Sequence, residues 1–146
     1  MSATLNQTLI ENKMHAVREY LQELGTHLSR NTVAIIGDHT ILHAIERLFQ
    51  LTVDTAIDIN VHLILVENIS VPDDYRNMFI VLGERNVLPY EFALRIANSV
   101  GLRNKLVHKY EEVLKKKMIE DMKAGLSQYH EYLKYIDEYL KLKARA

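Results

Sequence analysis

Apolar side chains recur every three to five residues along most of this chain, the spacing that gathers them on one face of an α-helix. The first such stretch starts at about residue 2 or 4 and ends at residue 28. Residues 32–37 predict a short apolar connector. Asp38 is a favourable helix N-cap, and the next apolar stripe predicts a long helix over residues 39–66.

The second half of the sequence predicts shorter helices followed by one long helix. A helix over about residues 74–82 should end near Gly83, and Pro89 suits the first turn of the next helix. That helix should continue to about residue 113 with a slight bend at Gly101, and a last helix should cover about residues 116–142. No stretch alternates long enough to predict a sheet. We therefore predict a single all-α domain, residues 1–146, folded as a four- to five-helix up-and-down bundle.

Composition is compatible with one globular domain that has a hydrophobic core. The 146 residues are 48% hydrophobic and 25% charged. The absence of cysteine excludes disulfides, thiolate metal sites and a cysteine nucleophile. The N-terminal residues lack a basic stretch followed by an apolar run, and no apolar segment approaches the roughly 20 residues that span a bilayer. We expect a cytoplasmic protein without a signal peptide or membrane span.

The overall charge is close to neutral, but one segment is basic. The formal net charge of −1 is unusual for a protein that binds nucleic acid through phosphates. Between residues 103 and 117, however, six basic residues face only Glu111 and Glu112: Arg103, Lys105, Lys109, Lys115, Lys116 and Lys117. The lysines predict a surface that attracts RNA phosphates. The alternative is a solvated lysine run at a helix start.

Residues 101–110 carry the clearest candidate chemistry. On a helix that turns about 100° per residue, Leu102, Leu106 and Val113 lie on one side. The polar residues of this segment share the other side: Arg103, Asn104, His108 and Tyr110. A helix here would bury an apolar stripe and present an organised polar face.

That polar face suits cleavage of a phosphodiester. The guanidinium of Arg103 matches a phosphate bidentately, and the His108 imidazole can exchange protons near neutral pH. Asn104 lies four residues before His108, close enough to orient the imidazole or the substrate. RNA carries its own nucleophile, the 2′-hydroxyl, so a base and charge stabilisation suffice without a metal. The alternative is that this arginine and histidine belong to an ordinary solvated helix face.

Residues 103–110, Arg-Asn-Lys-Leu-Val-His-Lys-Tyr, resemble the Arg-x4-His-x-Tyr motif of HepT-type HEPN ribonuclease toxins. Parts of residues 75–104 resemble that family's run into the motif, and residues 43–51 resemble its second helix. The resemblance covers roughly residues 38–140. Relatives often have an Asp-Pro-type break after the motif tyrosine, whereas this chain continues Glu-Glu-Val-Leu-Lys at residues 111–115. That departure leaves open where the last helix begins.

The resemblance implies a two-fold homodimer whose motif helices face a shared groove. Arg103 and His108 would cleave RNA there, with Asn104 as the polar residue after the arginine. It also implies a partner, a minimal nucleotidyltransferase antitoxin of the MntA type that adenylylates the motif tyrosine, here Tyr110. The attached AMP would bring negative charge and bulk beside Arg103 and repel RNA. No cofactor is expected.

Two other readings of the same face remain open. The chain could be a non-catalytic helical subunit that serves a nucleotidyltransferase as partner or substrate-binding subunit, a reading that the near-neutral charge favours. It could also be a structural dimer in which the motif face is only an interface.

Three further features favour structural roles. His39 and His43 have a spacing that can grip a metal, but no third ligand is evident, so we predict no metal site. Glu46 is a candidate partner for an arginine across the motif groove. The last helix carries a tyrosine stripe, which we expect to pack in the bundle with hydroxyls at its rim rather than stack on RNA bases: Tyr129, Tyr132, Tyr135 and Tyr139.

Overall fold

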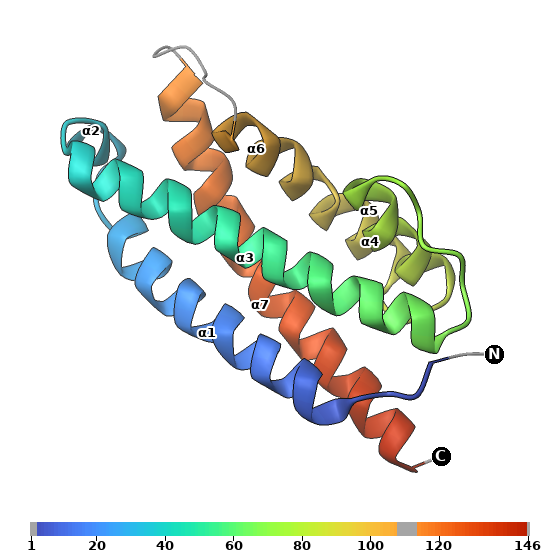
Figure 1. Cartoon of the computed structure of the whole chain (residues 1–146). Helices are drawn as coiled ribbons and strands as arrows, with labels where there is room; N and C mark the ends of the chain where they lie inside the picture. The colour runs from blue at the N-terminus through green and yellow to red at the C-terminus, as the bar shows by residue number, and fades with distance from the viewer. Residues whose placement is uncertain (1–2, 108–113, 146) are drawn as a thin grey trace.

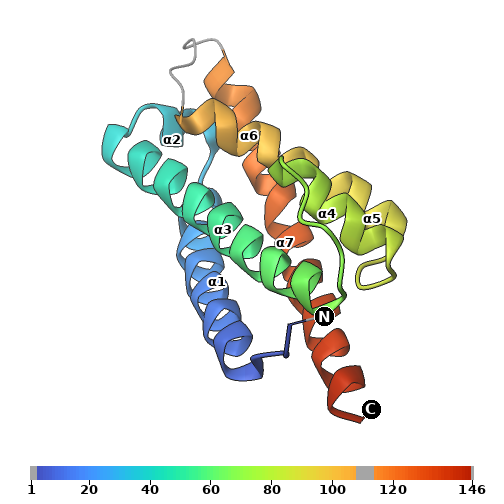
Figure 2. The ribbon, with the colours of Figure 1, turned by 45° about the vertical axis from the view of Figure 1, so that its right-hand side comes forward.

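The computed structural model describes residues 3–107 and 114–145. These residues form α1 (Gln7–Leu28), α2 (Thr32–Ile36), α3 (His39–Val66), α4 (Tyr75–Glu84), α5 (Tyr90–Ile96), α6 (Asn98–Val107) and α7 (Lys115–Arg145), with no strand in the described ranges. The long helix α1 packs along both of the other long helices, α3 and α7 (Figure 1). Helices α4 to α6 lie on the opposite side of α3 and α7 from α1 (Figure 2). The predicted all-α up-and-down bundle is confirmed.

Side-chain caps determine where three of the helices begin. The side chains of Asn6, Asp38 and Asp74 each accept a hydrogen bond from the backbone N–H three residues further on, at 3.1, 3.2 and 2.8 Å. Each bond satisfies one of the backbone donors that a helix start leaves without a partner. The predicted cap at Asp38 is confirmed, and α1 begins later than predicted because Asn6 caps it.

Two predictions about helix boundaries were wrong. Residues 32–37, predicted as a connector, form the short helix α2, which the Asn31 side chain caps. The predicted fourth helix is divided at Ala97 into α5 and α6, whereas Gly101 lies inside α6. Because α5 and α6 are separate elements, α6 packs against both α3 and α7.

Helix α4 ends at Glu84, close to Gly83 as predicted, and Gly83 itself is buried in the last turn of the helix. A Cβ atom at this position would lie 2.6 Å from the Cβ of Ala93 in α5. The absence of a side chain at Gly83 therefore allows α4 and α5 to pack closely against each other.

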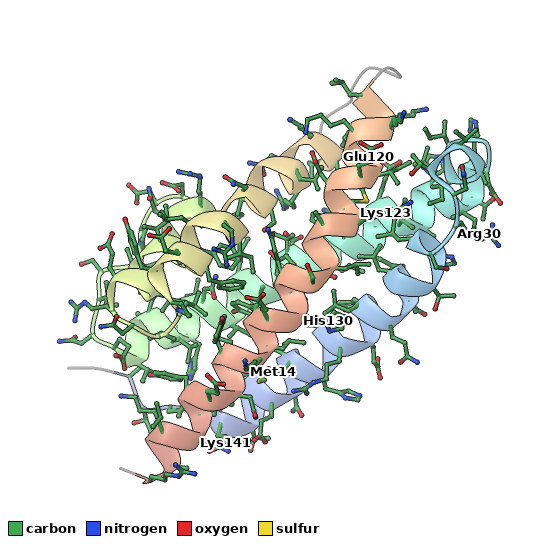
Figure 3. The ribbon with its side chains drawn as sticks, turned by 180° about the vertical axis from the view of Figure 1, so that it is seen from behind. Met14, Arg30, Glu120, Lys123, His130 and Lys141 are labelled. Carbon is green, nitrogen blue, oxygen red and sulfur yellow. The ribbon has the colours of Figure 1, made fainter. Side chains whose placement is uncertain are left out.

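Polar contacts fix α7 against the rest of the bundle. Figure 3 shows α7 in front, with α1 and α6 on opposite sides of it, and Lys123 beside Arg30. The Lys123 ammonium donates to the Arg30 carbonyl oxygen at 3.1 Å and to Thr32 Oγ1 at 3.0 Å. This contact holds the connection between α1 and α2 on α7.

The tyrosine stripe of α7 packs in the bundle as predicted, but the hydroxyls of Tyr129 and Tyr132 are buried inside it rather than placed at its rim. Three of its hydroxyls contact polar groups of α6, of α3 or of the α3 C-cap: Tyr129 with Ser99 at 2.7 Å, Tyr132 with Asn60 at 2.6 Å and Tyr139 with Glu67 at 2.8 Å. Burial raises the pKa of Tyr129 and of Tyr132, so both hydroxyls stay protonated. The alternative of stacking on RNA bases is wrong for these three residues, because their rings are buried.

Helix α3 is the apolar centre of the bundle. By length and composition alone it is also a candidate membrane span, contrary to the expectation from the sequence. Half of its most apolar stretch is buried against other helices, and α3 contacts α1, α2, α4 and α6. We interpret α3 as a core helix, since a buried helix satisfies the same test of length and composition.

Candidate functional site

Arg103 lies on α6 at the boundary between the buried and exposed sides of that helix. Its neighbour Leu102 is buried, whereas the Arg103 side chain keeps 20% of its surface exposed. The guanidinium has three contacts: its Nε donates to Asp54 at 2.8 Å, its Nη1 donates to Asn104 at 3.2 Å, and its Cζ lies 5.8 Å from the centre of the Tyr75 ring. Groups from α3, α4 and α6 therefore orient this arginine.

The hydrogen bonds to Asp54 and Asn104 use two of the N–H donors of the Arg103 guanidinium. An arginine has five N–H donors. Asp54 accepts from Nε and Asn104 accepts from one N–H of Nη1, so three N–H groups have no acceptor among the described residues. A planar cation anchored through Nε and Nη1, with both N–H groups of Nη2 lacking an acceptor among the described residues, is suited to bind a phosphate bidentately.

Asp54, the acceptor for Arg103, is a candidate site residue that the sequence analysis did not identify. It lies in α3, and its side chain is 36% exposed. Within the chain Arg103 pairs with Asp54, two turns further along α3 than Glu46, and the prediction that Glu46 pairs with an arginine across the motif groove stays a prediction. A signal was present: Asp54 interrupts an apolar helix and has no basic residue three or four positions away. A partly buried carboxylate on such a helix favours a cation from another element.

Asn104 is exposed, and its side-chain oxygen is used by Arg103. This contact orients the guanidinium, while the amide NH₂ group can still donate to a substrate. His108, Tyr110 and Lys109, the other predicted residues of this segment, lie outside the described residues.

The structure separates the predicted RNA-binding lysines. Lys105 and Lys117 line the same cavity of about 490 Å³ between α6 and α7. Lys115 and Lys116 are the first two residues of α7. Arg103 is not part of the lining of this cavity, because it lies on the other side of α6, against α3 and α4. The cavity and the arginine site are thus two distinct places.

The histidine pair at the start of α3 packs ring against ring. The rings of His39 and His43 lie edge to face with their centres 6.4 Å apart. Within residues 3–107 and 114–145, no group of three or more His, Cys, Asp or Glu side chains is arranged to hold a metal ion.

Comparisons with known proteins identify the family of this chain and agree with its fold. The family profile described as "Ribonuclease HepT-like" matches residues 17–136. A protein of Aphanizomenon flos-aquae (strain 2012/KM1/D3) named "tRNA nuclease HepT" is 31% identical over 138 residues, which cover 93% of this chain and 92% of the relative.

Solved structures share the fold at low sequence identity. A tri-AMPylated Shewanella oneidensis HEPN toxin in complex with an MNT antitoxin has a TM-score of 0.82 and 20% identity, over 92% of this chain and 99% of that one. YutE of Bacillus subtilis, described as a cytosolic protein of unknown function, has a TM-score of 0.78 and 16% identity, over 95% of this chain and 93% of that one. The match to the family profile and the curated relative together show that this chain belongs to the ribonuclease HepT-like family.

Proposed function

We propose that this protein is a ribonuclease toxin of a toxin–antitoxin system that cleaves RNA without a metal ion. Family membership and the relative named as a tRNA nuclease support the activity. The observation that carries the proposal is the guanidinium of Arg103, which is anchored by Asp54 and Asn104 with three N–H groups free of acceptors among the described residues.

In the proposed reaction, His108 takes the proton of an RNA 2′-hydroxyl. The 2′-oxygen then bonds to the adjacent phosphorus, the bond from phosphorus to the 5′-oxygen breaks, and the leaving 5′-oxygen takes up a proton from water. The hydroxide left behind takes the proton that His108 holds. The products carry a 2′,3′-cyclic phosphate and a 5′-hydroxyl. Arg103 stabilises the negative charge that builds up on the phosphate oxygens, and Asn104 keeps Arg103 oriented.

The decisive experiment measures cleavage of labelled RNA by the purified full chain in EDTA. Wild type should cleave, and Arg103→Ala and His108→Ala should both lose cleavage while they remain folded. If either variant cleaves like wild type, the assignment of that residue is wrong.

We further propose that the active form is a cytoplasmic homodimer regulated by a minimal nucleotidyltransferase. The likeness to HEPN toxin structures solved with MNT or MntA antitoxins supports such a partner. Tyr110 is the proposed target of AMP transfer. Intact-mass analysis after incubation with ATP and the cognate nucleotidyltransferase should show a mass gain that Tyr110→Phe abolishes. A gain that persists in Tyr110→Phe would move the target to another residue.

The near-neutral net charge favours a second candidate function, a non-catalytic helical subunit of a nucleotidyltransferase. This alternative predicts tight binding to the nucleotidyltransferase and intact RNA at every protein concentration. The cleavage experiment in EDTA therefore separates the two functions.

A further inference from the structure

The cavity between α6 and α7, called here the α6–α7 cleft, collects positive charge from three helices. Arg95 comes from α5, Lys105 from α6 and Lys117 from α7, and all three line the cleft. Its volume of about 490 Å³ lies in the range of about 300–1,000 Å³ that is usual for sites that bind small ligands. Asp121 is the one carboxylate in the lining that the described residues supply.

Two of these cations have no carboxylate partner among the described residues. Lys117 pairs with Asp121 at 3.1 Å, within one turn of α7. In the described part of the chain, neither Arg95 nor Lys105 forms an ion pair. The Arg95 guanidinium carbon lies 5.9 Å from the centre of the Phe92 ring. Two cations from different helices, neither neutralised by a carboxylate of residues 3–107 or 114–145, therefore face one cleft, an arrangement that attracts an anion.

The cleft is kept open by small residues and bordered by amides. A Cβ atom at Gly101 would meet no heavy atom within 4 Å, so the cleft has space at this position. The lining also includes Gly125 and Ala124 on α7. The side chains of Asn98 and Gln128 supply donors and acceptors that could bind a ribose hydroxyl or a base edge.

Helix α6 connects this cleft with the arginine site. Arg103 and Lys105 are two residues apart, which places them about 200° apart around the helix axis. An α-helix with its side chains is about 10–12 Å across, so the two sites are separated by roughly one helix width. Asn104 lies between them and is exposed. A single RNA strand that crosses α6 at Asn104 could occupy both sites.

We propose that the α6–α7 cleft binds an RNA nucleotide next to the one held by Arg103. Arg95 and Lys105 bind its phosphate, and the amides of Asn98 and Gln128 bind its sugar or base. This inference rests on the proposed function, because it takes RNA as the ligand. A free nucleotide offers the same groups, and the experiment separates these two sources.

The test uses the full-length protein and a 2′-O-methyl RNA oligonucleotide, which lacks the nucleophile and is not cleaved. Fluorescence anisotropy gives Kd over a series of salt concentrations. Arg95→Ala should raise Kd about 3- to 10-fold. The plot of the logarithm of the association constant against the logarithm of the salt concentration should become less steep by about 0.7, the value for one lost phosphate contact on a single strand. The matched control is Arg18→Ala, which removes an exposed arginine of α1 that has no partner among the described residues. It should leave both quantities unchanged.

A second variant blocks the cleft without a change in charge. Gly101→Leu should fill empty space and favour the helix, so its Tm should be no lower than that of wild type, while its Kd for the oligonucleotide rises. A loss of affinity in a protein of undiminished stability cannot be attributed to misfolding.

Three outcomes would overturn the inference. If wild type cleaves RNA but Arg95→Ala and Gly101→Leu both bind the oligonucleotide like wild type, the cleft has no role in RNA binding, and the proposed function survives. If AMP or ATP binds wild type and not Arg95→Ala, while RNA binding is unchanged, the occupant is a free nucleotide. If wild type neither binds nor cleaves RNA, the proposed function fails together with the inference.

Discussion

Replacement of Asp54 by alanine would remove the acceptor that lies 2.8 Å from the Arg103 Nε. A hydrogen bond that involves a charged group contributes about 1.5–3 kcal/mol to stability. The Asp54 side chain is 36% exposed, so water screens this interaction, and we expect a loss of about 0.5–1.5 kcal/mol. For a domain of this size, that loss corresponds to a decrease in Tm of about 1–6 °C.

The effect of this substitution on RNA cleavage should be larger than its effect on stability. Without Asp54, the Arg103 guanidinium is free to turn away from the phosphate that it should stabilise in the transition state. We expect kcat to fall about 10- to 100-fold, which corresponds to about 1.4–2.8 kcal/mol, with a smaller change in KM. Asp54→Asn keeps an oxygen acceptor without the charge, so its kcat should lie between those of Asp54→Ala and wild type. Asp54→Glu keeps the charge and should likewise retain a higher kcat than Asp54→Ala.

Steady-state cleavage of a labelled RNA in EDTA measures these effects, and thermal unfolding of the same samples checks the fold. The matched control is Asp58→Ala, one turn further along α3, which removes an exposed carboxylate that pairs with Lys13 at 3.4 Å. It should cleave like wild type. If folded Asp54→Ala cleaves at the wild-type rate, Asp54 has no positioning role and the contact is only structural.

Three further predictions concern the packing that supports the site. Ser99 donates to a backbone carbonyl at 2.6 Å, so the Tyr129 hydroxyl donates to Ser99. Ser99→Ala should lower the free energy of unfolding in urea by about 1–3 kcal/mol because it leaves the buried Tyr129 hydroxyl unpaired, and Tyr129→Phe should lower it by less. A larger loss for Tyr129→Phe would contradict this. Burial alone would raise the pKa of Glu67, but its hydrogen bonds with Tyr139 and a lysine lower this pKa overall. The Glu67 carboxylate therefore stabilises the folded state above pH 4.5, its ordinary pKa, and this stabilisation is lost as the pH falls below that value. Tyr139→Phe should therefore cost about 1 kcal/mol at pH 7 and less at pH 3, and a pH-independent cost would refute the coupling. Gly83→Ala should destabilise by about 1–3 kcal/mol in urea, since its Cβ would lie 2.6 Å from an alanine Cβ, and unchanged stability would show that α4 and α5 can separate freely.

The sequence predicted those parts of the fold that depend on local chemistry. Asp38 begins α3 because its own side chain caps the helix, and the apolar stripe over residues 39–66 reflects the side of α3 that packs on its neighbours. The division at Ala97 carries no such signal, because neither proline nor glycine marks it. It allows α6 to pack on both α3 and α7, which depends on residues distant in the sequence.

The candidate site shows the same limit. The polar face with Arg103 and Asn104 follows from helical periodicity, and the structure places both side chains in contact. The contact with Asp54 joins residues 49 positions apart, a distance that no helical spacing predicts. Likewise, the proximity of Arg95 to Lys117 in the α6–α7 cleft arises only when α5 and α7 pack together.

In the proposed mechanism, the Arg103 guanidinium, fixed by Asp54, stabilises an RNA phosphate while the neighbouring 2′-hydroxyl of the RNA attacks that phosphate. The most direct test compares the ends of the RNA products, and the rate of their formation, for wild type and Arg103→Ala in EDTA. We predict 2′,3′-cyclic phosphate and 5′-hydroxyl ends from wild type and a loss of product from Arg103→Ala. Products with 5′-phosphate ends, or equal rates for the two proteins, would contradict the mechanism.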